Sequence, residues 1–181
     1  MGRFSDSATY LRSAKLDKID EAAFWRAATI SKSGKMIAGA YEMQRTGDVI
    51  KTYPKPLKIP LSIFIAEAAA AIGQDKRAKD IIKSIKKMEP NFKQKAEIGL
   101  IEGKLAASDG KQEKAVEKWE TVLQIGDRPS YVKASVARIN TLLRLERITP
   151  ADSIRELEKL RFLWRGDEFE FNLLRRLGTL Y

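Results

Sequence analysis

Two residue types are missing from this chain of 181 residues, cysteine and histidine. Without them there is no disulfide framework, no ordinary zinc site and no nucleophile–histidine catalytic arrangement. The densest acidic groups read as solvated helix faces and helix N-termini rather than as an acid–base pair. These groups are Glu156, Glu158, Asp167, Glu168 and Glu170. We therefore expect no catalytic, cofactor-binding or metal-binding residue, and a protein that is not an enzyme.

Long apolar runs and phosphate-binding loops are lacking as well. The longest apolar stretch, residues 59–73, contains Glu67 and is too short to span a bilayer. The first residues lack the apolar segment of a signal peptide, and a cysteine-free chain suits both the cytoplasm and the periplasm. The segment Ser33-Gly34-Lys35 has no upstream glycine and is not a phosphate-binding loop.

Positive charge is in excess, but it is not concentrated in one segment of the chain. The net charge is +10, while 44% of residues are hydrophobic and 32% are charged, a composition typical of globular proteins. The positive surplus is spread along the chain, which favours acidic partners in general. The most basic segment, residues 76–87, includes Asp80 and no aromatic residue that could stack on a base. Association with nucleic acid is kept as an alternative.

An internal repeat organises the middle of the chain. Two segments match at an offset of 37 residues, with small, glycine and large apolar positions in the same order. Small residues allow two antiparallel helices to cross closely, and a glycine after the first helix adopts positive φ without a Cβ clash. The matched pairs are Ala66 and Gly103, Ala69 and Ala106, Gly73 and Gly110, Ala78 and Ala115, Ile82 and Trp119, and Ile85 and Val122.

These positions resemble the 34-residue signature of the tetratricopeptide repeat family, with Pro90 at the closing proline. Leu174, Leu177-Gly178 and Tyr181 repeat the W-x2-L-G-x2-Y spacing that opens such a hairpin, with Leu174 at the Trp position. The resemblance implies an all-α fold, a right-handed α-α superhelix (solenoid) of antiparallel helical hairpins.

Three regions are expected from this pattern. Residues 1–46 form a degenerate N-terminal hairpin or cap, which turns at Gly34 and is weakened by Gly39. Residues 47–58 are a proline-containing connector without regular helix, followed by Pro60 in a first helical turn. Residues 59–181 hold the tetratricopeptide-like repeats and an incomplete last hairpin. Thr149 is expected to cap a helix that starts at Pro150.

The last hairpin has only its first helix. We expect Leu173, Leu174, Leu177 and Tyr181 to be exposed there, so that residues 168–181 could join two copies end to end. The stretch 160–178 is similar to segments of large tetratricopeptide-type proteins of alphaproteobacteria, which favours a fragment of a longer repeat protein. The helix that precedes this last hairpin is expected to end at Arg165-Gly166-Asp167.

The resemblance also implies a function and a site. It predicts a non-catalytic scaffold or adaptor that holds a partner peptide or helix in a concave groove lined by the first helix of each hairpin. The corresponding residues are Ile63, Glu67, Ala70, Leu100, Lys104, Ala107 and Arg175. A further alternative is the helical scaffold of an enzyme whose catalytic domain lies outside this chain. We expect the larger aromatic side chains to pack between helices: Phe24, Trp25, Trp119, Phe162 and Trp164.

Overall fold

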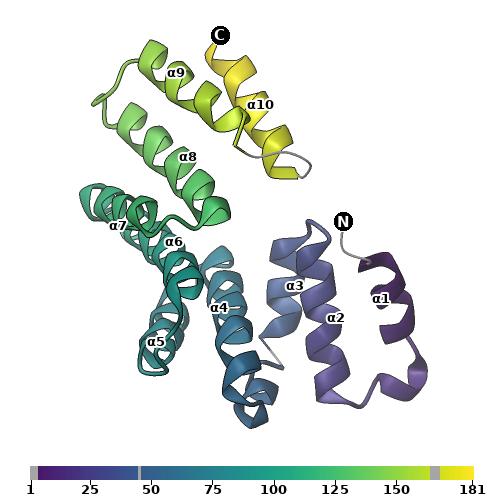
Figure 1. Ribbon diagram of the computed structural model, residues 1–181. Helices are drawn as coiled ribbons and strands as arrows, with labels where there is room; N and C mark the ends of the chain where they lie inside the picture. Colours follow the sequence, from purple (N-terminus) through teal and green to yellow (C-terminus); the bar gives the residue numbers. More distant parts are fainter. Residues whose placement is uncertain (1–3, 45, 164–167) are drawn as a thin grey trace. The chain divides into compact units, whose positions relative to one another are not determined.

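The computed structural model describes residues 4–44, 46–163 and 168–181, and every regular element within these ranges is helical (Figure 1). The all-helical prediction is therefore confirmed. The elements are α1 (Phe4–Leu11), η1 (Ala14–Leu16), α2 (Asp20–Lys32), α3 (Met36–Met43), η2 (Gly47–Thr52), α4 (Lys55–Ala71), α5 (Asp75–Lys86), α6 (Phe92–Ser108), α7 (Gln112–Ile125), α8 (Arg128–Arg144), α9 (Pro150–Arg161) and α10 (Glu168–Leu180), where η1 and η2 are 3-10 helices.

The helices form two compact units, Met1–Pro90 and Asn91–Tyr181, which are described separately. In the first unit α2 packs against α1 and α3, α3 also contacts α4, and α4 pairs with α5. The core of this unit gathers around the fully buried Phe24 and Met43 together with Phe64. At its margin the Tyr53 hydroxyl donates to the Glu21 carboxylate. Burial, followed by this hydrogen bond, raises the pKa of Tyr53.

Gly39 has a different role from the one predicted. A Cβ built on it would lie 2.1 Å from Ser31 Oγ and 2.5 Å from the carbonyl oxygen of Ala27. The backbone of α3 therefore passes α2 so closely that only glycine fits. Glycine still lowers the intrinsic helix propensity of α3, but the close crossing of α2 and α3 requires it.

The connector before α4 is shorter than predicted, and the expectation that residues 47–58 hold no helix is wrong. Residues 47–52 form η2, and α4 begins at Lys55 after Pro54 as its N-cap. Pro56 lies in the first turn, where the missing N–H costs no helical hydrogen bond. Pro60 lies inside α4 rather than in a first turn, and the remaining length of the helix tolerates it.

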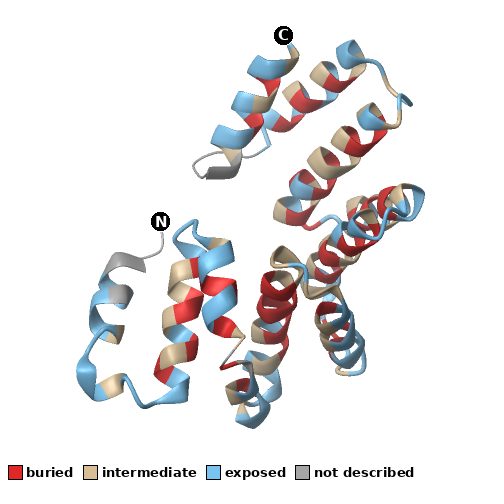
Figure 2. Cartoon of the chain, turned by 180° about the vertical axis from the view of Figure 1, so that it is seen from behind, coloured by how far each residue is buried: buried red, intermediate tan, exposed pale blue. Residues whose placement is uncertain are grey.

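In the second unit α6 pairs with α7, α8 packs against both, and α9 contacts α8 and α10. Buried residues lie along the helix faces that meet these neighbours (Figure 2). One core cluster surrounds Trp119 between α6, α7 and α8. A second joins α8, α9 and α10 through Val132, Leu157 and Leu173.

The positions matched by the 37-residue offset have matching environments. Every member other than the two glycines of the turns is buried, both in the α4–α5 hairpin and in the α6–α7 hairpin. The predicted positive φ is confirmed at both turn glycines, with 75° at Gly73 and 77° at Gly110. At Gly103 a Cβ would lie 2.2 Å from Trp119 Nε1, so the glycine makes room for the indole.

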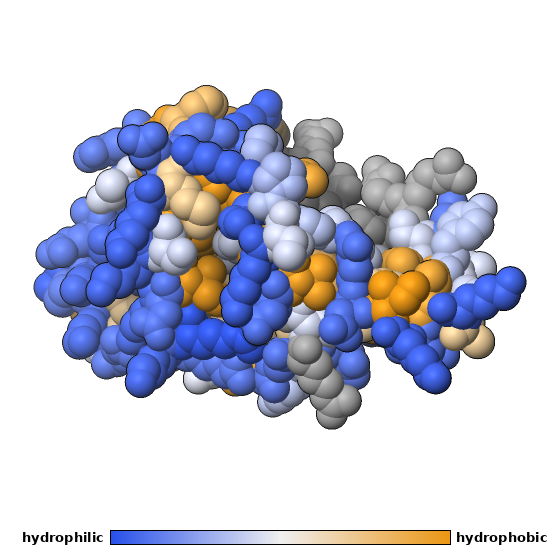
Figure 3. Space-filling model, turned by 90° about the horizontal axis from the view of Figure 1, so that it is seen from below, coloured by the Kyte–Doolittle hydropathy of each residue, from blue (hydrophilic) through white to orange (hydrophobic). Residues whose placement is uncertain are grey.

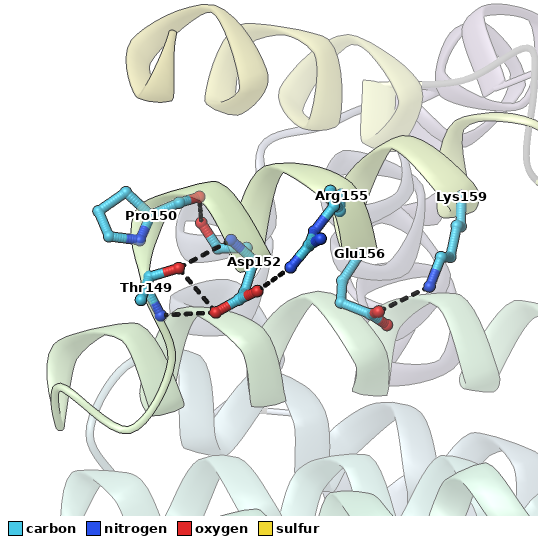
Figure 4. A network of polar contacts seen from close by, with 7 residues as sticks. Thr149, Pro150, Asp152, Arg155, Glu156 and Lys159 are labelled. Carbon is cyan, nitrogen blue, oxygen red and sulfur yellow. Dashed lines mark hydrogen bonds and ion pairs between the residues drawn. The ribbon is translucent and has the colours of Figure 1, made fainter.

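The start of α9 agrees with its sequence signature. Thr149 Oγ1 accepts from the backbone N–H of Asp152 at 3.1 Å and donates to Asp152 Oδ2 at 2.7 Å (Figure 4). Asp152 also accepts from the backbone N–H of Thr149 and is paired with Arg155. The hydrogen bond from Thr149, followed by the one from Arg155, lowers the pKa of Asp152. The predicted N-cap is thus confirmed.

The last helix is covered more fully than predicted. Leu173 and Leu177 are buried in the cluster with α8 and α9, so the expectation that they are exposed is wrong. Leu174 keeps 42% and Tyr181 78% of their surface exposed, as predicted. The Tyr181 hydroxyl donates to Glu158 Oε1 at 2.6 Å, and this bond raises the pKa of Tyr181. Helix α9 ends at Arg161, so the prediction that it extends to residues 165–167 is wrong; residues 164–167 themselves lie outside the described ranges.

Candidate functional site

A hollow of about 430 Å³ lies between α8 and α10 in the second unit. Both helices contact α9, and their buried leucine and valine side chains share one core, which fixes their spacing. The hollow is lined by Val136, Asn140, Asn172, Leu173, Arg175, Arg176 and Thr179. It combines an apolar floor with amide, hydroxyl and guanidinium groups, the combination expected of a ligand or peptide site.

One direct hydrogen bond crosses the hollow. Arg176 Nε donates to Asn140 Oδ1 at 3.1 Å, so a half-buried guanidinium is held by a neutral amide. Arg175 is exposed, and no hydrogen bond or ion pair joins its guanidinium to a residue in the described part of the chain. The Thr179 hydroxyl is turned to the backbone carbonyl of Arg175 at 3.0 Å.

The charge at this site is uncompensated. Two guanidinium groups line the hollow, and none of its lining residues is acidic. Two arginines of α8 are engaged with α7 instead: Arg138 Nε pairs with Glu120 Oε1 at 2.9 Å, and Arg144 donates to the Gln112 amide oxygen at 2.6 Å. Guanidinium groups bind carboxylates through two parallel hydrogen bonds, so the free donors of Arg175 suit an acidic group.

The predicted groove residues fall into two sets. Arg175 lines the hollow, and Leu100, Lys104 and Ala107 lie at helical spacing on α6 in the same unit, with Lys104 exposed. The other set lies on α4 in the first unit. Ile63 there is only 5% exposed, which leaves little surface for a partner, while Glu67 and Ala70 are half-buried.

Sequence reasoning missed Val136 and Asn140, although a signal for them existed. Asn91 and Asp127 are 36 residues apart, and each accepts the backbone N–H of the third residue of its helix. The same shift of 36 carries Leu100 to Val136 and Lys104 to Asn140. The small-residue pattern hides this register because Ile139 stands where α6 has Gly103.

The aromatic residues divide into buried and exposed ones. Phe24 and Trp119 are buried, which confirms their role in packing. Trp25 is at the margin, where its Nε1 donates to the Tyr53 hydroxyl at 3.3 Å. Phe162 is 64% exposed, so the prediction that it packs between helices is wrong. Trp164 lies outside the described residues.

Two other kinds of site are absent from the described ranges. They contain no group of three acidic residues arranged to hold a metal ion. They also contain no helix whose length and apolar character would let it cross a membrane. On the face drawn in Figure 3, hydrophobic side chains appear as separate areas among hydrophilic ones. The hollow between α8 and α10 is therefore characterised by its two arginines rather than by a large apolar area.

Comparisons of the chain with protein-family models, with curated proteins and with solved structures find no match.

Proposed function

We propose that this chain is a non-catalytic scaffold or adaptor, a tetratricopeptide-like solenoid segment that binds an acidic peptide or partner helix along α6, α8 and α10. The observation that carries the proposal is the hollow between α8 and α10, where two arginines line one cavity with no acidic neighbour. Lys104 on α6 extends the positive surface at the position equivalent to Asn140.

The packing of the second unit supports a solenoid. In such arrays the first helix of each hairpin packs on both helices of the hairpin before it, and α8 contacts both α6 and α7. The matched environments of the two hairpins add support from the sequence repeat. The first helices then line one surface, on which the half-buried Leu100 and Val136 offer apolar contact.

The expected interaction is a carboxylate held by Arg175, with apolar side chains of the partner above Val136 and Leu100. Arginine with free donors beside apolar surface is a frequent centre of binding energy in protein interfaces. The spread positive charge of the chain, +10 in all, speeds the approach of an acidic partner without determining where it binds.

The test is selection of random dodecamer peptides on the purified chain, followed by fluorescence anisotropy titrations of the enriched sequences. We expect acidic peptides whose affinity falls about tenfold with Arg175→Glu and with Lys104→Glu, which corresponds to ~1.4 kcal/mol each. Lys114→Glu on α7 is the matched control, because it makes the same charge change on an exposed lysine of a helix outside the proposed surface.

Two results would contradict this function. One is a peptide affinity that ignores both substitutions on the proposed surface. The other is tighter binding of DNA or RNA whose logarithmic affinity falls steeply with salt, which would instead support a nucleic-acid-associated protein.

A further inference from the structure

A second cleft lies within the first unit, between η2, α4 and α5, and holds about 440 Å³. Each of the three elements supplies one isoleucine to its apolar surface, Met88 after α5 adds a fourth apolar side chain, and the polar groups come from the same three elements. The lining residues are Asp48, Ile50, Lys51, Lys58, Ser62, Ile65, Arg77, Ile81, Ser84 and Met88.

One of the hydroxyls lining the cleft has no partner within the described residues. Ser62 is 5% exposed, and no hydrogen bond joins its side chain to any described residue. The hydroxyls of Thr29, Thr121 and Thr179, by contrast, each donate to the backbone carbonyl four residues earlier. The Ser62 hydroxyl is therefore free to bond a polar group of a ligand in the cleft.

The cleft also carries an excess of positive charge. Lys51 Nζ is paired with Asp48 at 3.0 Å, which neutralises the one acidic residue of the lining. Lys58 Nζ donates to the backbone carbonyl of Lys51 at 2.7 Å, and Arg77 donates to the neutral Gln74 amide at 3.3 Å. Two cations therefore face the cleft without a carboxylate.

These two cations lie at opposite ends of the cleft. Helices α4 and α5 run antiparallel around the turn at Gly73, so Arg77 is near the turn while Lys58 lies toward the far end, beside Met88. Arg77 and Met88 are 11 residues apart in sequence, which is about 16 Å along the helix axis. Ile65 and Ile81 provide apolar surface between the ends.

We propose that this cleft binds a short extended peptide segment in which two acidic residues flank a large apolar one. Its carboxylates pair with Lys58 and Arg77, and its apolar side chain lies on Ile65 and Ile81. An extended backbone has free N–H and C=O groups, which the Ser62 hydroxyl can bond, whereas a helix has used its own. At 3.3 Å per residue the first and fifth residues of an extended peptide are about 13 Å apart, and their glutamate side chains extend this reach toward the two cations.

A single-headed amphiphile, such as a fatty acid, matches this cleft less well. It would bring one anionic group to one cation and place its chain end near the other, leaving that charge uncompensated. The site lies in the first unit and shares no residue with the α8–α10 hollow, so it is independent of the proposed function.

The experiment uses two fluorescein-labelled peptides of equal composition, acetyl-ESLSE-amide and its isomer acetyl-SEELS-amide, titrated by fluorescence anisotropy against the whole chain. We expect the first to bind about tenfold more tightly, because only its carboxylates reach both cations. Lys58→Glu and Arg77→Glu should each weaken it about tenfold, and Ser62→Ala about threefold. Thermal unfolding of each variant checks that it is folded. Lys58→Met and Arg77→Met form a second, milder pair of variants, because they remove each positive charge without reversing it.

The matched control is Lys76→Glu, an exposed lysine next to Arg77 that does not line the cleft, and it should leave the affinity unchanged. Arg175→Glu should also leave the affinity unchanged, which distinguishes this site from the hollow between α8 and α10. Equal binding of the two isomers would overturn the proposal, and so would an equal loss with Lys76→Glu. Binding of decanoate that depends on Arg77, with no peptide binding, would replace it by an amphiphile site.

Discussion

The hairpins α4–α5 and α6–α7 share one arrangement of two helices, but different side chains fill the crossing between them. Each has a first helix of 17 residues, a short turn with a glycine at positive φ, and buried residues at the matched positions. The α4–α5 hairpin has Ala66 with Ile82, and the α6–α7 hairpin has Gly103 with Trp119 at the same places. A larger side chain on the second helix goes with a smaller one on the first.

At the α6–α7 crossing, the large side chain on the second helix is accommodated by the absence of a side chain on the first. The indole of Trp119 occupies the place of a Cβ on Gly103, at 2.2 Å from its ideal position. Gly99 is equally close to Val122, where a Cβ would lie 2.5 Å from Cγ2. Stable cores require close packing without strain. The residue on the first helix and its contact on the second helix therefore have to be considered as a pair.

The largest expected effect is the loss of the indole. Trp119→Ala should lower the free energy of unfolding by about 3–5 kcal/mol, because Gly103 has no side chain to move into the cavity. Ile82→Ala, at the matched position of α5, should cost about 2–4 kcal/mol. Urea denaturation monitored by circular dichroism measures both. A smaller loss for Trp119→Ala than for Ile82→Ala would break the comparison.

Exchange of one pair for the other is the next test. Gly103→Ala alone should cost about 1–3 kcal/mol, because the new Cβ overlaps the indole. The double variant Gly103→Ala with Trp119→Ile recreates the pair of the α4–α5 hairpin. We expect it to lose at least 1 kcal/mol less than the sum of its two single variants, since contacting residues are coupled. Additive losses in urea denaturation would show that the two positions are not coupled.

The turn glycines should behave alike. Gly73→Ala and Gly110→Ala meet no atom within 4 Å, so only the positive φ is costly. Each should lower the stability by about 1–2 kcal/mol, the cost of a left-handed backbone for a residue with a Cβ. Thermal unfolding of the two variants tests this equality. A difference greater than the cost itself would mean that the turns differ in more than conformation.

The smallest effects concern helix starts, where the hairpins differ again. Helix α4 has no side-chain cap, whereas α6 has the neutral capping box of Asn91 and Gln94. Asn91→Ala should cost about 1 kcal/mol at both pH 7 and pH 3, since neither group titrates. The corresponding change at α4, Pro54→Ala, removes no side-chain bond, and urea denaturation at both pH values compares the two.

The charged cap of α9 provides the pH-dependent contrast. The pKa of Asp152 is lowered in the folded protein, so its stabilisation is present above the unfolded pKa and is lost as the pH falls through the folded one. Wild type should exceed Asp152→Asn in thermal midpoint at pH 7, and the gap should close toward pH 3. A difference in thermal midpoint that stays constant with pH would show that packing, rather than the charge of Asp152, causes it.

Residue-type patterns predicted the features that depend on neighbours along the chain. Positive φ at Gly73 and Gly110 follows from the preference of glycine after a helix, and the Thr149 cap follows from a short-range signature. The buried faces of α5 and α7 follow from helical spacing. Arg175 was placed on the candidate surface by its offset from Leu177-Gly178, and it does line the hollow there.

Features that depend on how close two elements come could not be predicted in this way. Gly39 is a poor helix former by propensity, and only the α2–α3 crossing shows that nothing larger fits. Asn140 is an ordinary polar residue of α8 until α10 brings Arg176 within 3.1 Å. Pro56 and Pro60 look like helix breakers, yet Pro56 occupies the first turn of α4 and the helix continues through Pro60.

The sequence by itself determined the helical class, the hairpin register from Ala66 to Val122 and the overall positive charge, because these depend on local preference and periodicity. Tertiary structure alone decided that Leu173 and Leu177 are buried while Leu174 is exposed, and that two clefts carry uncompensated cations. The physical reason is that burial and charge compensation depend on which helices meet. A helix of one composition can present the same residues to a core, to solvent or to a partner.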